Sequence, residues 1–260
     1  MGEPAPGEEP SAFLRSYSAM DAALDEAIAP FRTGDAPLAV LFSGGVDSGL
    51  LAWELRRRPA VRLVTVGVAG SADLEAAARA ATVLGLPSDR VELSEIEVRT
   101  AADRASAESR DLPRVARHVL VAFGAALERA PAPSVLCGQG ADELFLGYAH
   151  FRSLSERAAL ERSEADLHTL LERDWPRAQA LAARNGRRVF APYLHPGFVA
   201  AARAIPIGWR LPGDESKSYF RRWAEHRGLP HAIARRPKRA LQYGSGVDRI
   251  LARWERSDGP

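Results

Sequence analysis

Cysteine is nearly absent from this chain of 260 residues, because Cys137 is its single thiol. One cysteine excludes an internal disulfide, a zinc site built on paired cysteines and a thiol relay of two neighbouring cysteines. We therefore do not expect nucleophilic thiol chemistry, and any reaction of this protein must use other side chains.

Long apolar runs are missing too. No segment approaches the roughly 18 consecutive apolar residues that a membrane-spanning helix needs. The first residues, MGEPAPGEEPS, are acidic and rich in proline, whereas a secretory signal is basic and then apolar. With 46% hydrophobic residues the chain can still bury a full core. We expect a cytoplasmic protein without membrane contact, whose residues 1–10 form a disordered tail.

Lysine is the third scarce residue type. Lys217 and Lys238 are the two lysines among 35 basic side chains, and the remaining 33 are arginine. A lysine kept in such a background is a candidate for a position that needs a compact ammonium group. The net charge of +2 is too small to indicate a nucleic-acid partner, so we do not expect one.

The stretch LAVLFSGGVDS, residues 38–48, is the strongest signal among the residues that are present. Its apolar half is typical of a strand buried on both faces of a parallel sheet. Gly44 and Gly45 allow a sharp turn and the close approach of a ligand, and a helix from about Ser48 would direct free N–H groups at that turn. We expect a phosphate there, with an ordinary strand-to-helix turn as the alternative. Asp47 is a hard oxygen ligand suited to magnesium.

A second segment also has an apolar run that is followed by glycines and carboxylates. The apolar run SVLC leads into GQGADELFLGY, residues 138–148. The carboxyl ends of parallel strands meet at one edge of a sheet, so we expect Asp142 and Glu143 to face the same cleft as Asp47. Carboxylates from two loops around one triphosphate would hold magnesium. As an alternative, Asp142 and Glu143 cap the helix that begins there.

Strands alternate with helices in the first part of the chain, which indicates an α/β fold with a doubly wound parallel sheet. An N-terminal helical segment over 11–36 precedes an ATP-binding core over 37–150. Expected strands of this core lie near 38–42, 61–68, 91–93 and 134–137. Beyond residue 150 the pattern shows helices and no further clear strand, so 151–260 is predicted to be a helical C-terminal part.

SGGVDS resembles the signature of the PP-loop ATP pyrophosphatases, whose fold is of the adenine nucleotide alpha hydrolase type. GQGADELFLGY resembles the corresponding segment of the asparagine synthetases. Segments 191–206, 215–230 and 235–247 match the same family in the same order. The resemblance covers residues 23–247 and implies a ligase that adenylates a carboxylate, aspartate or a related acid, with ATP. Pyrophosphate would leave, and ammonia or another amine would take the acyl group.

The resemblance also implies roles for particular residues. Asp47 and Asp142 would bind Mg²⁺, Lys238 would reach the α-phosphate, and Lys217 would be structural. A weaker candidate for the acceptor pocket is Asp111. The positions implied to bind ATP and pyrophosphate are Leu41, Ser43, Gly44, Gly45, Asp47, Ser48, Val66, Gly67 and Gly140.

Two departures from the family bear on the reaction. Gln139 stands where asparagine synthetases carry a glutamate, and an amide cannot act as a base. The amine must then lose its proton to Glu143, to water or to the phosphate. About 35 residues precede the first strand, so we expect no glutaminase domain with its N-terminal cysteine. Free ammonia, a separate glutaminase or another pathway enzyme would supply the nitrogen.

Two other functions are compatible with the motifs. One is a tRNA-modifying PP-loop enzyme that adenylates a base, and the other is a module that binds a nucleotide without reaction. Most tRNA-modifying PP-loop enzymes that transfer sulfur need paired cysteines, which this chain lacks. We expect small-molecule acid and amine substrates, and a homodimer as the assembly.

Overall fold

A computed structural model describes residues 11–211, 213, 215–236 and 244–257 of the chain. Its sheet has five strands in the order β3-β2-β1-β4-β5, and all neighbouring strands are parallel. The doubly wound parallel sheet predicted from the sequence is thereby confirmed. The strands are β1 (Leu38–Leu41), β2 (Val61–Gly67), β3 (Ser88–Glu92), β4 (Ser134–Leu136) and β5 (Arg188–Phe190).

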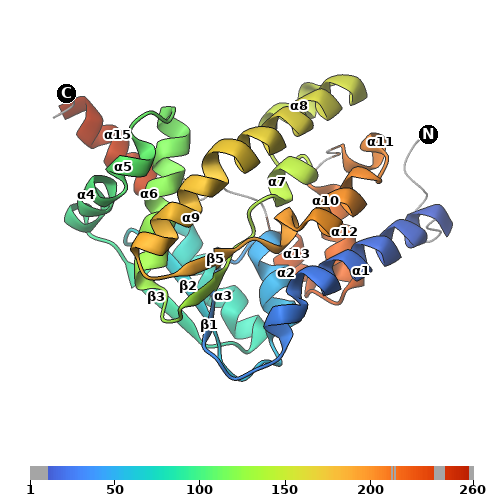
Figure 1. The fold of residues 1–260 in the computed structure, drawn as a ribbon, viewed down its shortest axis with the longest axis horizontal. Helices are drawn as coiled ribbons and strands as arrows, with labels where there is room; N and C mark the ends of the chain where they lie inside the picture. The colour runs from blue at the N-terminus through green and yellow to red at the C-terminus, as the bar shows by residue number, and fades with distance from the viewer. Residues whose placement is uncertain (1–10, 212, 214, 237–243, 258–260) are drawn as a thin grey trace.

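Helices cover both faces of this sheet (Figure 1). Those that begin within the first 150 residues are α1 (Ser11–Arg32), α2 (Val46–Leu55), α3 (Ala72–Leu84), α4 (Glu95–Arg104), α5 (Ser106–Ser109), α6 (Arg114–Arg129), α7 (Ala141–Leu144) and the 3-10 helix η1 (Ala149–Ser153). Those that follow are α8 (Glu156–Thr169), the π-helical turn η2 (Leu170–Asp174), α9 (Trp175–Arg184), the 3-10 helix η3 (Pro192–Leu194), α10 (Pro196–Arg203), α11 (Ile207–Arg210), α12 (Ser218–His226), α13 (His231–Ala234) and α15 (Val247–Ser257). None of the helices in the described ranges is long and apolar enough to cross a membrane.

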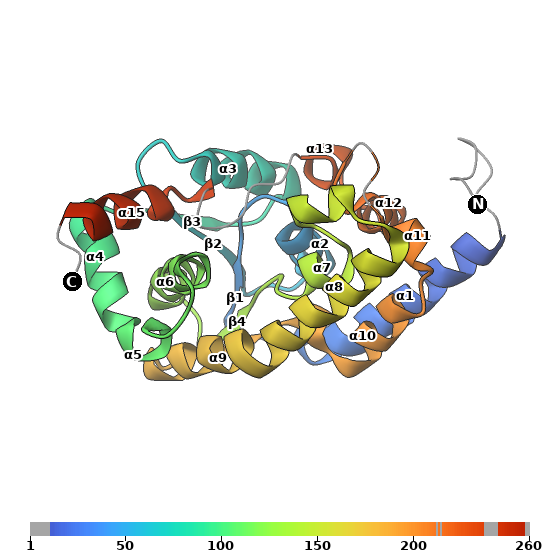
Figure 2. The same cartoon turned by 90° about the horizontal axis from the view of Figure 1, so that it is seen from above.

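Two hydrophobic cores lie on the two faces of the sheet. Successive side chains of a strand point to opposite faces, so Leu38 and Val40 enter one core while Ala39 enters the other. Helices α1, α2, α10 and α12 pack into the first core, and α4, α6, α9 and α15 into the second. Figure 2 shows these two groups of helices on either side of the strands.

Strand β5 corrects the expectation that the C-terminal part contains no strand. It pairs with β4, and Val135 lies opposite Val189. The strand is three residues long and has one fully buried position, so it carries no periodicity that a sequence pattern could reveal. The sheet therefore extends past residue 150, and one strand anchors the otherwise helical C-terminal part at its edge.

The strand order changes direction between β1 and β4. The chain winds from β1 through β2 to β3 on one side and then continues with β4 and β5 on the other. Val40 and Leu136 are neighbours in the register of this central pair. Ligands of open α/β sheets bind outside the carboxyl ends of the strands at such a reversal. The loops after β1 and β4 therefore border the expected binding position.

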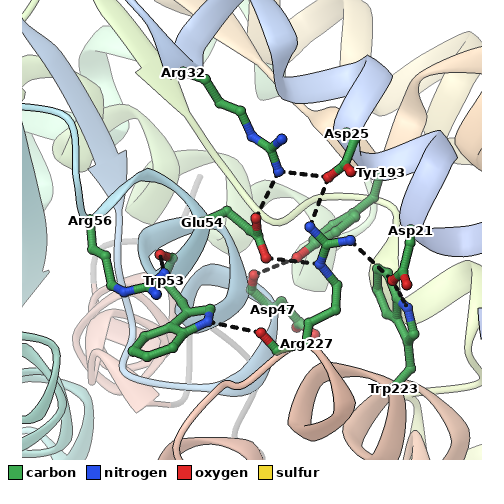
Figure 3. A network of polar contacts seen from close by, with 10 residues as sticks. All are labelled: Asp21, Asp25, Arg32, Asp47, Trp53, Glu54, Arg56, Tyr193, Trp223 and Arg227. Carbon is green, nitrogen blue, oxygen red and sulfur yellow. Dashed lines mark hydrogen bonds and ion pairs between the residues drawn. The ribbon is translucent and has the colours of Figure 1, made fainter.

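Arg227, directly after α12, fastens the C-terminal part to two N-terminal helices (Figure 3). Its guanidinium donates to Asp21 of α1 at 3.0 Å, Asp25 of α1 at 2.8 Å and Glu54 of α2 at 2.8 Å. Its carbonyl oxygen accepts from the indole N–H of Trp53 at 3.0 Å. The Arg227 side chain is 11% exposed, so water screens these ion pairs only weakly.

We expect Arg227→Ala to lower the free energy of unfolding by about 2–4 kcal/mol, because Asp21 would lose its pairing with Arg227 and, within the described ranges, Asp25 and Glu54 would keep only Arg32. Urea unfolding at neutral pH measures this loss. Arg157→Ala is the matched control, since its guanidinium is 90% exposed and pairs with Glu161 within α8. Exposed pairs contribute little to stability, so this control should unfold close to the wild type. Equal losses in the two variants would contradict the role given to Arg227.

Candidate active site

The loop after β1 turns at Gly44, whose φ of 72° lies in the left-handed region. A Cβ on Gly44 would stand 2.8 Å from backbone atoms of Ala76 in α3, so the packing of α3 also requires glycine. Gly45 has a φ of −89° and precedes α2 as its N-cap. The free N–H groups at the start of α2 thus border the loop between Ser43 and Ser48, which suits an anion.

The loop after β4 touches the first loop. A Cβ on Gly138 would lie 2.8 Å from the Cβ of Asp47, so the two loops meet without space for a further side chain atom. Gly140, with a φ of 95°, then turns the chain into α7. The first turn of α7 carries Asp142 and Glu143. The structure thus places carboxylates from both loops at one edge of the sheet.

Lys217 lies between Asp47 and Asp142. Its Nζ donates to both carboxylate oxygens of Asp47 at 2.7 Å and forms an ion pair with Oδ1 of Asp142 at 2.8 Å. The Lys217 side chain is fully buried, whereas the two aspartates are 22% and 21% exposed. Two carboxylates share one ammonium group, so this cluster keeps an excess of negative charge.

The carboxylates keep the buried ammonium of Lys217 protonated. Burial alone favours the neutral amine, but the charges of Asp142 and Asp47 and their hydrogen bonds outweigh it and raise the pKa of Lys217. The sequence indicates a structural role for this lysine and does not reveal that its ammonium joins the two loops. The scarcity of lysine is the one signal that marks the position.

Glu143 is a buried carboxylate next to this cluster. The Tyr148 hydroxyl donates to Oε1 of Glu143, and Oγ of Ser163 donates to the Glu143 backbone oxygen at 2.8 Å. Burial, together with the charges of Glu143 and Asp142, raises the pKa of Tyr148 well above its ordinary value. Tyr148 therefore remains a protonated donor at neutral pH.

A cavity of about 630 Å³ lies beside these groups and extends from the ends of β1 and β2 to η2 and the start of α9. Gly44, Gly45, Gly67 and Gly140 lie at the adjoining turns and strand end, outside its lining. The positions singled out in the sequence that line it are Leu41, Ser43, Asp47, Ser48, Val66, Gln139, Asp142 and Glu143.

Of the two positions that remain, one lies outside the described part of the chain and the other does not line this cavity. Lys238 belongs to residues 237–243, which lie outside the described part of the chain, so its role stays a prediction. Asp111 is 71% exposed and accepts two hydrogen bonds from Arg177 of α9, at 2.5 and 2.8 Å. Hydrogen bonding from Arg177 lowers the pKa of Asp111 to about 2. The Asp111 carboxylate therefore holds the segment before α6 against α9.

The carboxylates of Asp47 and Asp142 fit a small hard cation such as Mg²⁺. Ionised carboxylates are the oxygen donors that Mg²⁺ prefers, and each can accept more than the hydrogen bonds from Lys217. Within the described ranges, no group of three or more histidine, cysteine, aspartate or glutamate residues is arranged to hold a metal. Mg²⁺ would therefore need water and phosphate oxygens as further ligands, which is usual for this ion at nucleotide sites.

The parallel sheet with helices on both faces and the glycine-containing loop after β1 define a doubly wound α/β protein. Within that class the chain belongs to the asparagine synthase family, whose model matches residues 19–165 and 153–257.

Known proteins of this family cover most of the chain. A relative from Methanocaldococcus jannaschii, named as a glutamine-hydrolyzing asparagine synthetase, is 28% identical over 89% of this chain and 50% of its own length. Asparagine synthetase B of Escherichia coli is 25% identical over 88% of this chain and 45% of its own. The chain thus spans about half the length of these relatives. Among solved structures, the U34-tRNA thiolase NcsA from Methanococcus maripaludis is similar with a TM-score of 0.41 and 14% identity, covering 96% of this chain and 75% of that one.

We expect Lys217→Met to lower the free energy of unfolding by about 3–5 kcal/mol at pH 7, because it leaves two neighbouring carboxylates without their cation. Urea unfolding measures the loss. In the wild type the pKa of Lys217 is raised in the folded state. The contribution of the Lys217 ammonium to the free energy of unfolding is therefore complete below pH 10.5, which is the ordinary pKa of lysine. It declines at higher pH and is lost once the folded protein also gives up this proton.

The double variant Lys217→Met/Asp142→Asn is the matched control, since it removes one carboxylate together with the ammonium. It should recover part of the stability that Lys217→Met loses. A single variant as stable as the wild type at pH 7 would show that the three groups do not interact as the structure indicates.

Proposed function

We propose that this protein is an ATP-dependent ligase that adenylates a carboxylic acid and then transfers the acyl group to ammonia or another amine. The contact of Asp47 and Asp142 through Lys217 carries this proposal, because it joins the two glycine-containing loops beside one cavity. Membership of the asparagine synthase family supports it.

In the first step a carboxylate oxygen of the acid attacks the α-phosphorus of ATP. A bond from that phosphorus to the acid forms, and the bond to pyrophosphate breaks. The loop from Ser43 to Ser48 and the N-terminus of α2 are suited to hold the departing pyrophosphate. Asp47 and Asp142 would hold Mg²⁺, which neutralises triphosphate charge when bound. Lys238, from its place in the family pattern, would stabilise the charge that develops on the α-phosphate.

In the second step the amine nitrogen attacks the acyl carbon, and AMP leaves with the electron pair of the bond that breaks. The nitrogen must lose a proton, which Gln139 cannot take. Glu143, water or the phosphate can accept it. Glu143 lines the cavity and accepts a hydrogen bond from Tyr148, so it is the side chain we assign to this role.

The identities of acid and amine are part of this proposal. Membership of the asparagine synthase family makes aspartate or a related carboxylic acid the first candidate for the acid. The amine is ammonia or an organic amine, supplied free, by a separate glutaminase or by another enzyme of the same pathway.

Sulfur transfer to tRNA is not favoured. Cys137 is the single cysteine of the sequence, it is buried, and burial raises the pKa of its thiol to about 12. A thiol in that environment is a poor nucleophile. Nucleotide binding without reaction is a further alternative, which requires ATP to bind while no AMP forms.

We expect the purified chain to release AMP and pyrophosphate from ATP when Mg²⁺, a suitable carboxylic acid and an amine are present together. Lys238→Ala should lower kcat by about 100-fold or more, because it removes a charge that acts on the transition state. Liquid chromatography of the nucleotides measures AMP, and mass spectrometry identifies the amide.

Arg256→Ala is the control, because it removes an exposed cation from α15 and should leave the rate unchanged. Formation of ADP in place of AMP would contradict the mechanism. So would AMP release without any acid, or a fully active Lys238→Ala variant.

A further inference from the structure

One wall of the cavity is apolar and comes from residues 112–126, most of which belong to α6. Every side chain that residues 112–126 contribute to the lining is apolar, including Leu112, Val115, Ala116 and Val119. Figure 2 shows α6 on one side of the strand ends and α8 on the other. Leu112 and Leu120 both belong to the core that contains β2, and Ala116 packs against it. We assign the lining from Leu112 to Val119, at the start of α6, to contact with the second substrate.

The opposite wall comes from the end of α8, η2 and the start of α9. Leu170 and Trp175 line it with apolar surface. Leu170 is the first residue of the π-helical turn η2 and Trp175 directly follows it, and such turns are frequent at functional sites. The two walls together give the cavity most of its apolar lining.

The charged groups at this end are already paired with one another. Within the described lining the cationic or titratable bases are His150, Arg162 and Arg173. Arg162 pairs with Asp166 at 2.8 Å, and His150 lies 3.3 Å from the other oxygen of Asp166. Arg173 donates to both oxygens of the neighbouring Asp174, at 2.7 and 3.2 Å. A second carboxylate on a substrate would meet paired cations and additional acidic side chains.

We propose that the acid adenylated by this protein has an apolar aliphatic or aromatic body, and that its reacting carboxylate is its one charged group. This inference rests on the proposed ligase function and specifies its substrate class. An apolar body gains by leaving water against α6 and Trp175. The additional charged groups of aspartate would lose water there without matching partners.

The first experiment compares 3-phenylpropanoate, hexanoate and aspartate with the wild-type chain, MgATP and hydroxylamine as the amine. We expect kcat/KM for AMP release to be at least about tenfold higher with 3-phenylpropanoate or hexanoate than with aspartate, the discrimination expected when a substrate places unmatched polar groups in such a pocket. Equal or higher kcat/KM with aspartate would overturn the substrate class and leave the ligase function intact.

A variant tests the α6 wall directly. Val119→Lys places a cation on the apolar face, so the ratio of kcat/KM for 3-phenylpropanoate over that for aspartate should fall at least about tenfold. Val83→Lys is the matched control, because Val83 is 51% exposed on α3 and does not line the cavity. An unchanged ratio in folded Val119→Lys would overturn the assignment of this wall.

A binding experiment distinguishes the proposed ligase function from the proposed apolar substrate class. It uses the wild-type chain, so it does not require that the Val119→Lys variant folds. Calorimetry with the wild-type chain measures the binding of 3-phenylpropanoate and of aspartate in the presence of Mg²⁺ and α,β-methylene-ATP, an analogue that cannot transfer its adenylyl group because its α–β bridge is not cleaved. Tighter binding of 3-phenylpropanoate without AMP release from ATP would support the apolar site and reject the ligase function. If neither acid binds and neither supports AMP release, both proposals fail.

Discussion

The contacts of Lys217 join three segments that lie far apart along the chain, around residues 47, 142 and 217. Carboxylates compensate a buried ammonium for its loss of water, and a cation between two neighbouring carboxylates reduces their repulsion. Each group thus depends on the other two. The arrangement also fixes the loops after β1 and β4 relative to each other, and it fastens α12 from the C-terminal part against both.

Arg227 makes a similar connection on the other side of α2. It binds carboxylates of α1 and α2, while Lys217, at the opposite end of α12, binds carboxylates at the start of α2 and in α7. One helix of the C-terminal part therefore holds two sets of acidic side chains through cations at its two ends. These ion pairs add to the hydrophobic packing of α10 and α12 in the first core, which holds the helical part against the sheet.

The sequence predicted the parallel sheet well where local signals were strong. The apolar run before SGGVDS forms β1, and the strand expected over 61–68 is β2, which covers residues 61–67. The proximity of Asp47 and Asp142 could also be inferred, because loops after neighbouring parallel strands share an edge. Strand β5 could not be predicted, because three residues show no alternation and their pairing with β4 depends on the tertiary fold. The position of Lys217 depends on contacts with residues 170 and 75 positions earlier, which no local pattern records.

The single buried thiol of Cys137 has a practical consequence. Its sulfur lies in the core and stays protonated at neutral pH, so maleimide reagents would react with it slowly. A cysteine introduced at an exposed position would then be the main site of labelling without removal of the native one. Fluorescent or spin labels on α8 and α15 would thus report their separation while a nucleotide binds.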